Sequence, residues 1–255
     1  MARMNIRNII ASAVNIIVFF HLFIRGKIIP GFKVGRKDLV IDIGCGDKPF
    51  WRADVFLDKL SLGDEHRFSS TGVIKDFGLF FDSDVTKTPF KDKVFDFSYC
   101  SHLLEHVERP DLAIKEITRI SKRGYIEVPD GLIEVIWPYQ SHLWFIFFQK
   151  DTLIFLRKGK TLSGVLKNNG SRYSYLVRKM KDPFIRIYWE KKIRYKIIDN
   201  LTESDRFISR RDNDDAHLQA FYVQKLSLFL TTAARVLFYE RKEFGDVMKD
   251  AKYAK

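Results

Sequence analysis

Glycines and carboxylates around residue 45 are spaced in a way that suits the binding of a nucleoside. Gly44 and Gly46 directly follow an apolar run, where glycine permits a tight turn and a close approach of the backbone to a ligand. Asp42, inside that run, is placed to orient the turn. Asp58 follows the next apolar run and is placed to accept hydrogen bonds from two ribose hydroxyls.

A third carboxylate extends this pattern. Asp84 is followed by Val85, so a carboxylate and a backbone amide could pair with the edge of an adenine. A glycine turn alone is weak evidence, but acids after two further runs indicate an adenosine-containing ligand. Only 11 residues separate Gly46 from Asp58, and Pro49 interrupts them, so little or no helix is expected there. A site for a pyrophosphate at a helix N-terminus is correspondingly disfavoured.

The elements that would position these residues can be predicted from short apolar runs that end at glycine, an acid, a cysteine or proline. The five runs are Leu39–Ile43, Val55–Leu57, Gly78–Phe81, Val94–Tyr99 and Tyr125–Val128. Apolar residues recur at helical spacing over Asp111–Ser121, with Pro110 suited to the first turn. This order predicts an α/β fold with a doubly wound, mostly parallel sheet, which binds ligands at the carboxyl ends of its strands where the strand order reverses.

Four segments at these positions resemble the class I S-adenosylmethionine-dependent methyltransferases, especially the branch called type 11. They are LVIDIGCGDKPF (39–50), RADVFLD (52–58), DVTKTPFKDKVFDFSYCSHLLEHVERP (84–110) and GYIEVP (124–129). The resemblance implies a Rossmann-like fold and S-adenosylmethionine as cofactor. The site residues that it implies are Asp42, Gly44, Cys45 and Gly46 for the methionine part, Asp58 for the ribose, Asp84 and Val85 for the adenine, and Cys100, Ser101 and His102 beside the sulfonium.

Three histidines are candidates for the catalytic base that methylation of an alcohol needs. Transfer from a sulfonium is an in-line displacement, to which alignment and water exclusion contribute most. An alcohol must also lose a proton, and histidine is the usual base near neutral pH. His142 is the first choice, because it follows the fifth strand, with His102 and His106 as the others. Packing of His142 among the neighbouring aromatic residues is the alternative.

Two further patterns have both a functional and a structural interpretation. His102–His106 matches the HxxEH pattern of inverted zinc peptidases, but a five-residue match arises readily by chance, and no metal is expected. Cys45 and Cys100 follow neighbouring strands, where lining of a pocket is the ordinary explanation and a disulfide or a catalytic role is the alternative. Two cysteines are too few for a secreted disulfide framework, so a reducing compartment is expected.

The N-terminal segment is predicted to be an amphipathic helix. Its apolar run, 9–24, is shorter than the roughly 20 residues of a membrane-spanning helix. A narrow polar stripe at helical spacing faces a broad apolar surface, and arginines flank the run. We expect peripheral contact with a membrane through residues 4–25 of a cytoplasmic protein, on the inner face of that membrane. A cover helix on the protein's own core and a short spanning or signal segment are the alternatives.

The distribution of charge indicates an anionic partner. The chain has a net charge of +12, yet residues 38–130 contain 13 basic and 18 acidic residues, which leaves +17 for the rest. The leading hypothesis is O-methylation of a membrane-associated glycan, a lipid-linked molecule or another small anionic acceptor. An RNA-directed methyltransferase or a nucleic-acid-binding module is the alternative. A cofactor-binding protein without turnover is the third possibility.

The organisation expected along the chain is an N-terminal helix with its linker (1–37), a methyltransferase domain (38–200) and a C-terminal loop and helix (201–255). The domain divides into a cofactor half (38–130) and an acceptor-side half (131–200). Within the latter, Phe184–Ile198 alternates as two strands and predicts a hairpin. Leu218–Phe238 predicts a long helix with an apolar face for the sheet, a bilayer or a second subunit, so the sequence gives no oligomeric state.

Overall fold

The structure is a computed structural model of the 255-residue chain. It describes residues 17, 20–59, 77–136, 139–158, 182–199, 234, 235 and 237. The helices are the π-helix η1 (Ile24–Ile28), α2 (Ile29–Phe32), α3 (Pro110–Ile120) and α4 (Gly131–Ile136). The strands are β1 (Val40–Ile43), β2 (Val55–Asp58), β3 (Leu79–Asp82), β4 (Phe95–Ser101), β5 (Ser121–Pro129), β6 (Trp144–Gln149), β7 (Thr152–Arg157), β8 (Phe184–Glu190) and β9 (Tyr195–Ile198).

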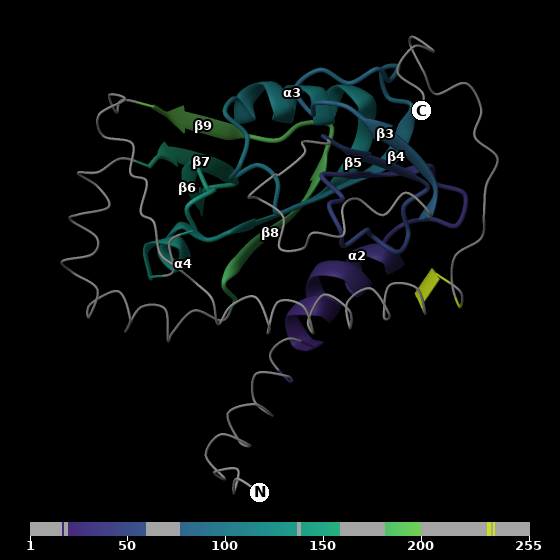
Figure 1. The fold of residues 1–255 in the computed structure, drawn as a ribbon, viewed down its shortest axis with the longest axis horizontal. Coiled ribbons are helices and arrows are strands. Elements are labelled where there is room, and N and C mark those ends of the chain that lie inside the picture. The colour runs from purple at the N-terminus through teal and green to yellow at the C-terminus, as the bar shows by residue number, and fades with distance from the viewer. Residues whose placement is uncertain are drawn as a thin grey trace, which may run out of the picture.

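The large sheet has six strands in the order β3-β2-β1-β4-β5-β8 (Figure 1). The first five run parallel, whereas β8 runs antiparallel to β5. The chain starts in the middle with β1, proceeds outward through β2 and β3, and then crosses to β4 on the other side. The strand order therefore reverses between β1 and β4, and the expected α/β fold with a mostly parallel, doubly wound sheet is confirmed.

Both faces of this sheet are covered, which is why β1 is buried throughout. Helix α3 packs one stripe, including Ala113 and Ile117, onto one face. Helices η1 and α2 lie on the other side of the sheet, as Figure 1 shows. There the hydroxyl of Tyr99 donates a hydrogen bond to the carbonyl of Gly26 over 2.8 Å, and the indole of Trp51 donates to the carbonyl of Lys27 over 3.0 Å.

The strands lie within a few residues of the predicted runs, and the largest difference is at β5. This strand begins at Ser121, four residues before the predicted Tyr125. Its first residues include Lys122 and Arg123, which form ion pairs with Asp96 and Asp38 at 2.7 and 2.6 Å. These charges made the segment too polar to be recognised as part of a buried strand.

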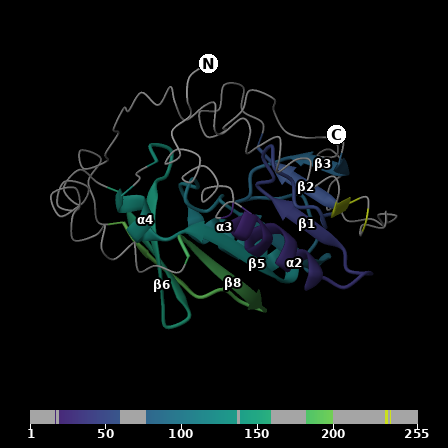
Figure 2. The same ribbon diagram turned by 90° about the horizontal axis from the view of Figure 1, so that it is seen from below.

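The prediction of a hairpin within Phe184–Ile198 is wrong. Strand β8 pairs with β5 in the large sheet, whereas β9 pairs with β7 in a separate sheet of order β6-β7-β9. Figure 2 shows β6 and α4 beyond β8, away from β1, β2 and β3. The hairpin that forms joins β6 to β7, with Lys150 and Asp151 at φ values of 48° and 56° in its turn. Two consecutive left-handed residues are the conformation that a tight hairpin turn requires.

The terminal segments are described only in part. Ile17 and residues 20–32 are helical, so the end of the expected amphipathic helix is present, and residues 1–16 lie outside the described residues. The predicted loop 201–215 also lies outside them, and of the predicted helix Leu218–Phe238 the structure describes Ala234, Arg235 and Leu237, all helical. In the described part of the chain, no helix has the length and hydropathy needed to cross a membrane.

Candidate functional site

The reversal point between β1 and β4 brings together the carboxyl ends that carry the predicted ligand residues. β1 ends at Ile43 before the glycine turn, β2 ends at Asp58, and β4 ends at Ser101. In the sheet register, Ile43 lies opposite Leu57 on one side and Cys100 on the other. An open α/β sheet binds its ligand in the crevice at this position.

The turn after β1 adopts the backbone that its glycines permit. Gly44 and Gly46 have φ values of +74° and +52°, which non-glycine residues rarely adopt. A Cβ on Gly44 would lie 2.9 Å from the side chain of Leu103, whereas a Cβ on Gly46 would meet no atom within 4 Å. The backbone at Gly46 therefore faces open space that a ligand can occupy, while Gly44 packs against the segment that follows β4.

Asp42, in β1, shapes the first crossover. It is buried, and its carboxylate accepts a hydrogen bond from the amide of Phe50 over 2.7 Å. Burial raises the pKa of Asp42 to about 6, although the Lys27 ammonium opposes this shift. The segment between β1 and β2 contains no helix, which confirms the short crossover predicted from its length and Pro49.

The acids after β2 and β3 line the same edge. A carboxylate oxygen of Asp58 accepts a hydrogen bond from the amide of Gly46 over 2.6 Å, so β2 is tied directly to the glycine turn. Asp84 accepts hydrogen bonds from the amide and hydroxyl of Thr86 and from Lys59 at 3.1 Å. Burial acts to raise the pKa of Asp84, but these bonds outweigh it and lower the pKa. Val85, beside it, is buried.

The end of β4 is joined to β5 through Glu127, which the sequence analysis did not identify. The hydroxyl of Ser101 donates to this carboxylate over 3.1 Å, and the Nε2 atom of His102 lies 3.3 Å from it. The Tyr125 hydroxyl and Arg186 also donate to it, over 2.8 and 2.5 Å. An acid inside the apolar run YIEVP was the available signal, because a buried charge requires partners.

His102 is a cation at neutral pH. Its Nδ1 and Nε2 atoms face the carboxylates of Glu105 and Glu127, at 3.2 and 3.3 Å. The ring is 41% exposed, so it is only partly desolvated; this opposes the charge, but the two carboxylates outweigh it and raise the pKa of His102 to about 9. A ring that holds its proton at pH 7 donates hydrogen bonds and is a poor base there. The charge of His102 therefore argues against it as the catalytic base.

The HxxEH segment does not form the helix that this zinc motif requires. His102 has a φ of +54°, in the left-handed region that a right-handed helix does not contain, and residues 104–106 form a turn. His102 and His106 are therefore not on one helical face. Instead His106 faces His142, with ring centroids 4.6 Å apart.

The candidate histidine after β5 lies in this cluster as well. The Nδ1 atom of His142 lies 2.5 Å from a carboxylate oxygen of Glu134, on α4, and Lys158 also binds Glu134. Burial acts to raise the pKa of Glu134, but its bonds to His142 and Lys158 outweigh it and lower the pKa. The amide of Leu143 donates to the carbonyl of Glu105 over 2.7 Å, which holds the segment after β5 against the segment after β4.

The two cysteines form no disulfide. Cys100 is in the hydrophobic cluster below α3, whereas Cys45 is in the cluster that includes Trp51 and Tyr99. Burial raises the pKa of the Cys100 thiol well above its usual range, so this side chain is a neutral thiol. Lining of the site, the ordinary interpretation, suits a neutral thiol better than a catalytic role does.

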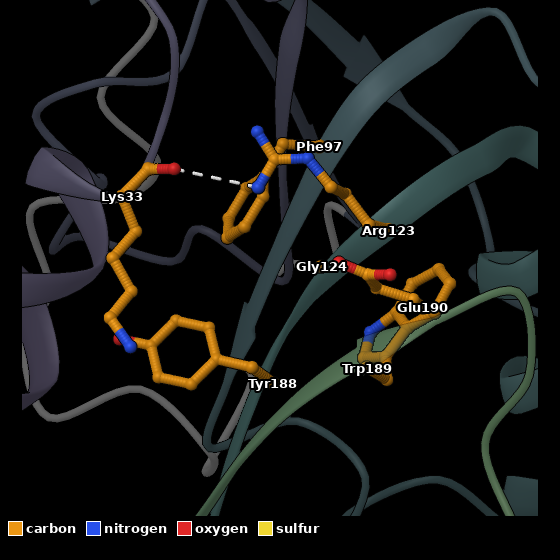
Figure 3. Close-up of a pocket in the computed structure, with 7 residues that line it drawn as sticks. All are labelled: Lys33, Phe97, Arg123, Gly124, Tyr188, Trp189 and Glu190. Atoms are coloured by element: carbon orange, nitrogen blue, oxygen red, sulfur yellow. Dashed lines mark hydrogen bonds between the residues drawn. The ribbon is translucent and has the colours of Figure 1, made fainter.

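A pocket of about 360 Å³ is present in the described structure at a different edge (Figure 3). Its walls come from α2's C-terminal side, the first halves of β4 and β5, and the end of β8. The lining residues are Lys33, Phe97, Arg123, Gly124, Tyr188, Trp189 and Glu190. Because Phe97 and Arg123 lie toward the amino ends of their strands, this pocket is distinct from the carboxyl edge with the predicted ligand residues.

The strand order, with its reversal between β1 and β4, is that of a Rossmann-like, doubly wound α/β sheet. More particularly, a family model described as a methyltransferase domain matches residues 65–126. The resemblance expected from the sequence is therefore confirmed over this segment. No curated protein matches the chain.

Several solved structures are similar to the chain at low identity. A methyltransferase in complex with the Trm112 methyltransferase activator of Haloferax volcanii is 21% identical with a TM-score of 0.32, over 46% of this chain and 57% of that one. A Thermotoga maritima protein described as a SAM-dependent methyltransferase is 17% identical (TM-score 0.31, 46% and 58%). The PH0226 protein of Pyrococcus horikoshii OT3 is 19% identical (TM-score 0.36, 58% and 80%). The chain thus spans less than two thirds of the first two proteins.

Proposed function

We propose that this protein is an S-adenosylmethionine-dependent methyltransferase that methylates an oxygen of a membrane-associated glycan, lipid-linked or other anionic acceptor. The observation that carries the methyltransferase assignment is the contact between Asp58 and Gly46 at the reversal point of the sheet. It joins the acid expected to bind a ribose to the turn expected to bind the methionine part, beside open space at Gly46. The match of residues 65–126 to a methyltransferase domain supports the assignment.

The cofactor residues proposed are those at the carboxyl edge. Asp42, Gly44, Cys45 and Gly46 form the turn for the methionine part, and Asp58 accepts from the ribose. Asp84 and Val85 bind the adenine, and Cys100, Ser101 and His102 form the wall beside the sulfonium. S-adenosylmethionine supplies a methyl group that leaves by in-line displacement, so the chain's main task is to align acceptor and cofactor and to exclude water.

The acceptor side is assigned to the cluster around Glu105, His106 and His142. Leu103 packs on Gly44, so the segment that carries this cluster is in contact with the cofactor turn. An acceptor hydroxyl placed here would lose its proton to this cluster, since His102 already holds a proton at neutral pH. The location of the cluster after β4 and β5 supports this role, because acceptor residues follow those strands in the class that the chain resembles.

The proposed membrane contact is supported by apolar side chains on the helix that precedes β1. Ile17, Phe20 and Ile24 are 67%, 36% and 45% exposed and share one helical face. Arg25 follows them and pairs with Asp182 at 2.8 Å, and the chain outside residues 38–130 has a net charge of +17. An exposed apolar stripe next to basic side chains is typical of a helix in an anionic membrane surface.

Calorimetric binding of S-adenosylhomocysteine to the purified full-length protein tests the assignment. We expect micromolar binding by the wild type and at least about a tenfold loss in Asp58→Ala, because a carboxylate that binds two hydroxyls contributes more than about 1.4 kcal/mol. Asp92→Ala is the matched control, since Asp92 pairs with Arg119 on the surface. If the folded wild type does not bind S-adenosylhomocysteine, the proposal is refuted. If Asp58→Ala and Asp92→Ala lose the same affinity, Asp58 does not bind the cofactor.

A further inference from the structure

We propose that Glu105, His106 and His142 form a binding site for a divalent transition-metal cation, best suited to zinc. One possible ligand atom from each residue lies within 4.8 Å of those from the other two. Tetrahedral zinc with bonds of about 2.1 Å needs donors roughly 3.4 Å apart, so closure of the site requires side-chain shifts of at most about 1.4 Å. The site combines two imidazoles with one carboxylate, a donor set that zinc uses with one coordination position left open.

The hydrogen bonds of the two histidines engage the Nδ1 atom of each ring. The Nδ1 atom of His106 lies 3.2 Å from the carbonyl oxygen of Ser141, and that of His142 lies 2.5 Å from Glu134. Because a carbonyl and a carboxylate oxygen can only accept, each Nδ1 donates, and Nε2 is the nitrogen of each ring that would bind a metal. A backbone carbonyl or a carboxylate on the second nitrogen is the arrangement that metal-bound histidines show.

Glu105 supplies the observation that is independent of the histidines. Its side chain is fully buried, and His102 contacts only the Oε1 atom. Among the described residues, no hydrogen-bond partner faces the buried Oε2 atom. A carboxylate oxygen left without a partner in the interior costs free energy unless a cation or a water molecule binds it. A metal bound to this oxygen would remove that cost.

The inference differs from the HxxEH interpretation, because His102 is not a ligand and His142 comes from a distant part of the sequence. Metal binding itself does not depend on methyl transfer. Its role at the acceptor side rests on the proposed function, in which the open coordination position would hold an acceptor oxygen and favour its deprotonated form. With the metal bound, the two imidazoles are ligands, so the acceptor proton would pass to solvent water rather than to the cluster, which acts as the base only in the metal-free protein.

The test is titration of the metal-free, untagged full-length protein with Co²⁺ and Zn²⁺. We expect one Zn²⁺ per chain by mass spectrometry and visible Co²⁺ absorption without a thiolate charge-transfer band. His106→Gln, His142→Gln and Glu105→Gln should each weaken Co²⁺ binding by at least about tenfold. His21→Gln, which changes an exposed histidine outside the cluster, should bind like the wild type.

Nitrogen NMR of the wild-type histidine rings keeps the proposal testable if the buried variants do not fold. Zinc should shift the Nε2 resonances of two of the six histidines, with Nδ1 protonated in both. The proposed site would be overturned if the wild type bound no metal, if Co²⁺ showed a thiolate band, or if the metal shifted Nδ1 instead of Nε2. It would also be overturned if folded ligand variants bound metal like the wild type. If the protein binds zinc but not S-adenosylhomocysteine, the metal site stands and the proposed function is refuted.

Discussion

At the residue scale, Glu127 is the most densely bonded carboxylate of the site. Ser101, Tyr125 and Arg186 donate to it, and His102 lies beside it. Burial acts to raise the pKa of Glu127, but these partners outweigh it and lower the pKa to about 2. Glu127 therefore stays ionised over the whole working range and fixes the positive charge of His102.

This arrangement predicts a pH dependence of stability. The pKa of His102 rises from 6.5 to about 9 on folding, so its protonated form stabilises the fold. That contribution is complete below pH 6.5 and is lost as the pH rises through 9. The free energy of unfolding should therefore fall less between pH 6.5 and 9 in His102→Gln than in the wild type, as measured by urea denaturation. Exposed His21→Gln should retain the wild-type slope, and identical slopes in all three proteins would contradict the prediction.

The two glycines of the turn predict a graded effect. Alanine in a left-handed conformation costs about 1–2 kcal/mol, so Gly46→Ala should lose about that much unfolding free energy. Gly44→Ala should lose more, because its Cβ would lie 2.9 Å from Leu103. Urea denaturation of both variants measures the difference. A larger loss in Gly46→Ala would show that the turn is not packed as described.

At the element scale, the sequence predicted the elements whose pattern is local. The strands β1 to β4 were found because a buried parallel strand is a short apolar run that ends at a turn residue. The glycine turn and Asp58 could be placed for the same reason. The pairing of β8 with β5 could not be predicted from the sequence. Alternation in Phe184–Ile198 shows which side chains share a face, but it does not show which strand lies beside them.

The same distinction separates the predicted from the unpredicted site residues. Asp42, Asp58 and His142 stand at the ends of local patterns or within a recognised motif. The partners Glu105, Glu127 and Glu134 were not assigned to one site, because they come together only when β4, β5 and α4 are packed. The roles predicted for the cofactor residues remain predictions that ligand binding will test.

The C-terminal helix residue Arg235 predicts a stability effect for an element far from the site. Its guanidinium donates to the carbonyls of Trp51, Ala53 and Phe77 at 3.0, 2.8 and 2.7 Å. Arg235→Met should lower the unfolding free energy by about 2–4 kcal/mol, because these carbonyls lose a charged donor.

Leu237→Met, on the exposed side of the same helix, is the control and should change the unfolding free energy by less than about 0.5 kcal/mol. Thermal and urea denaturation measure both variants. Equal effects would show that Arg235 does not hold the helix to the loops before β2 and β3.

At the scale of the whole molecule, charge and exposed apolar surface predict binding to anionic vesicles. Phe20→Asp should weaken binding by about tenfold or more, because it removes an apolar side chain and adds a repelled charge. Leu112→Asp is the matched control, since Leu112 is exposed on α3, on the other side of the sheet. Binding to anionic vesicles should also weaken as salt is added.

Cosedimentation with anionic and neutral vesicles measures these differences. Equal binding by both variants would refute contact through the N-terminal helix. If the protein does not bind vesicles but binds RNA with a steep salt dependence, the nucleic-acid alternative is favoured.

The pairing of β5 with β8 also bears on how the chain folds during synthesis. β5 is complete at Pro129, but its outer edge gains a neighbour only when residues 184–190 leave the ribosome. Until then a growing chain with four parallel strands beside β5 presents a row of unpaired amides and carbonyls, the kind of edge on which chains aggregate. Slow translation between these strands should therefore lower the yield of folded protein, and β8 acts as the strand that ends this exposure.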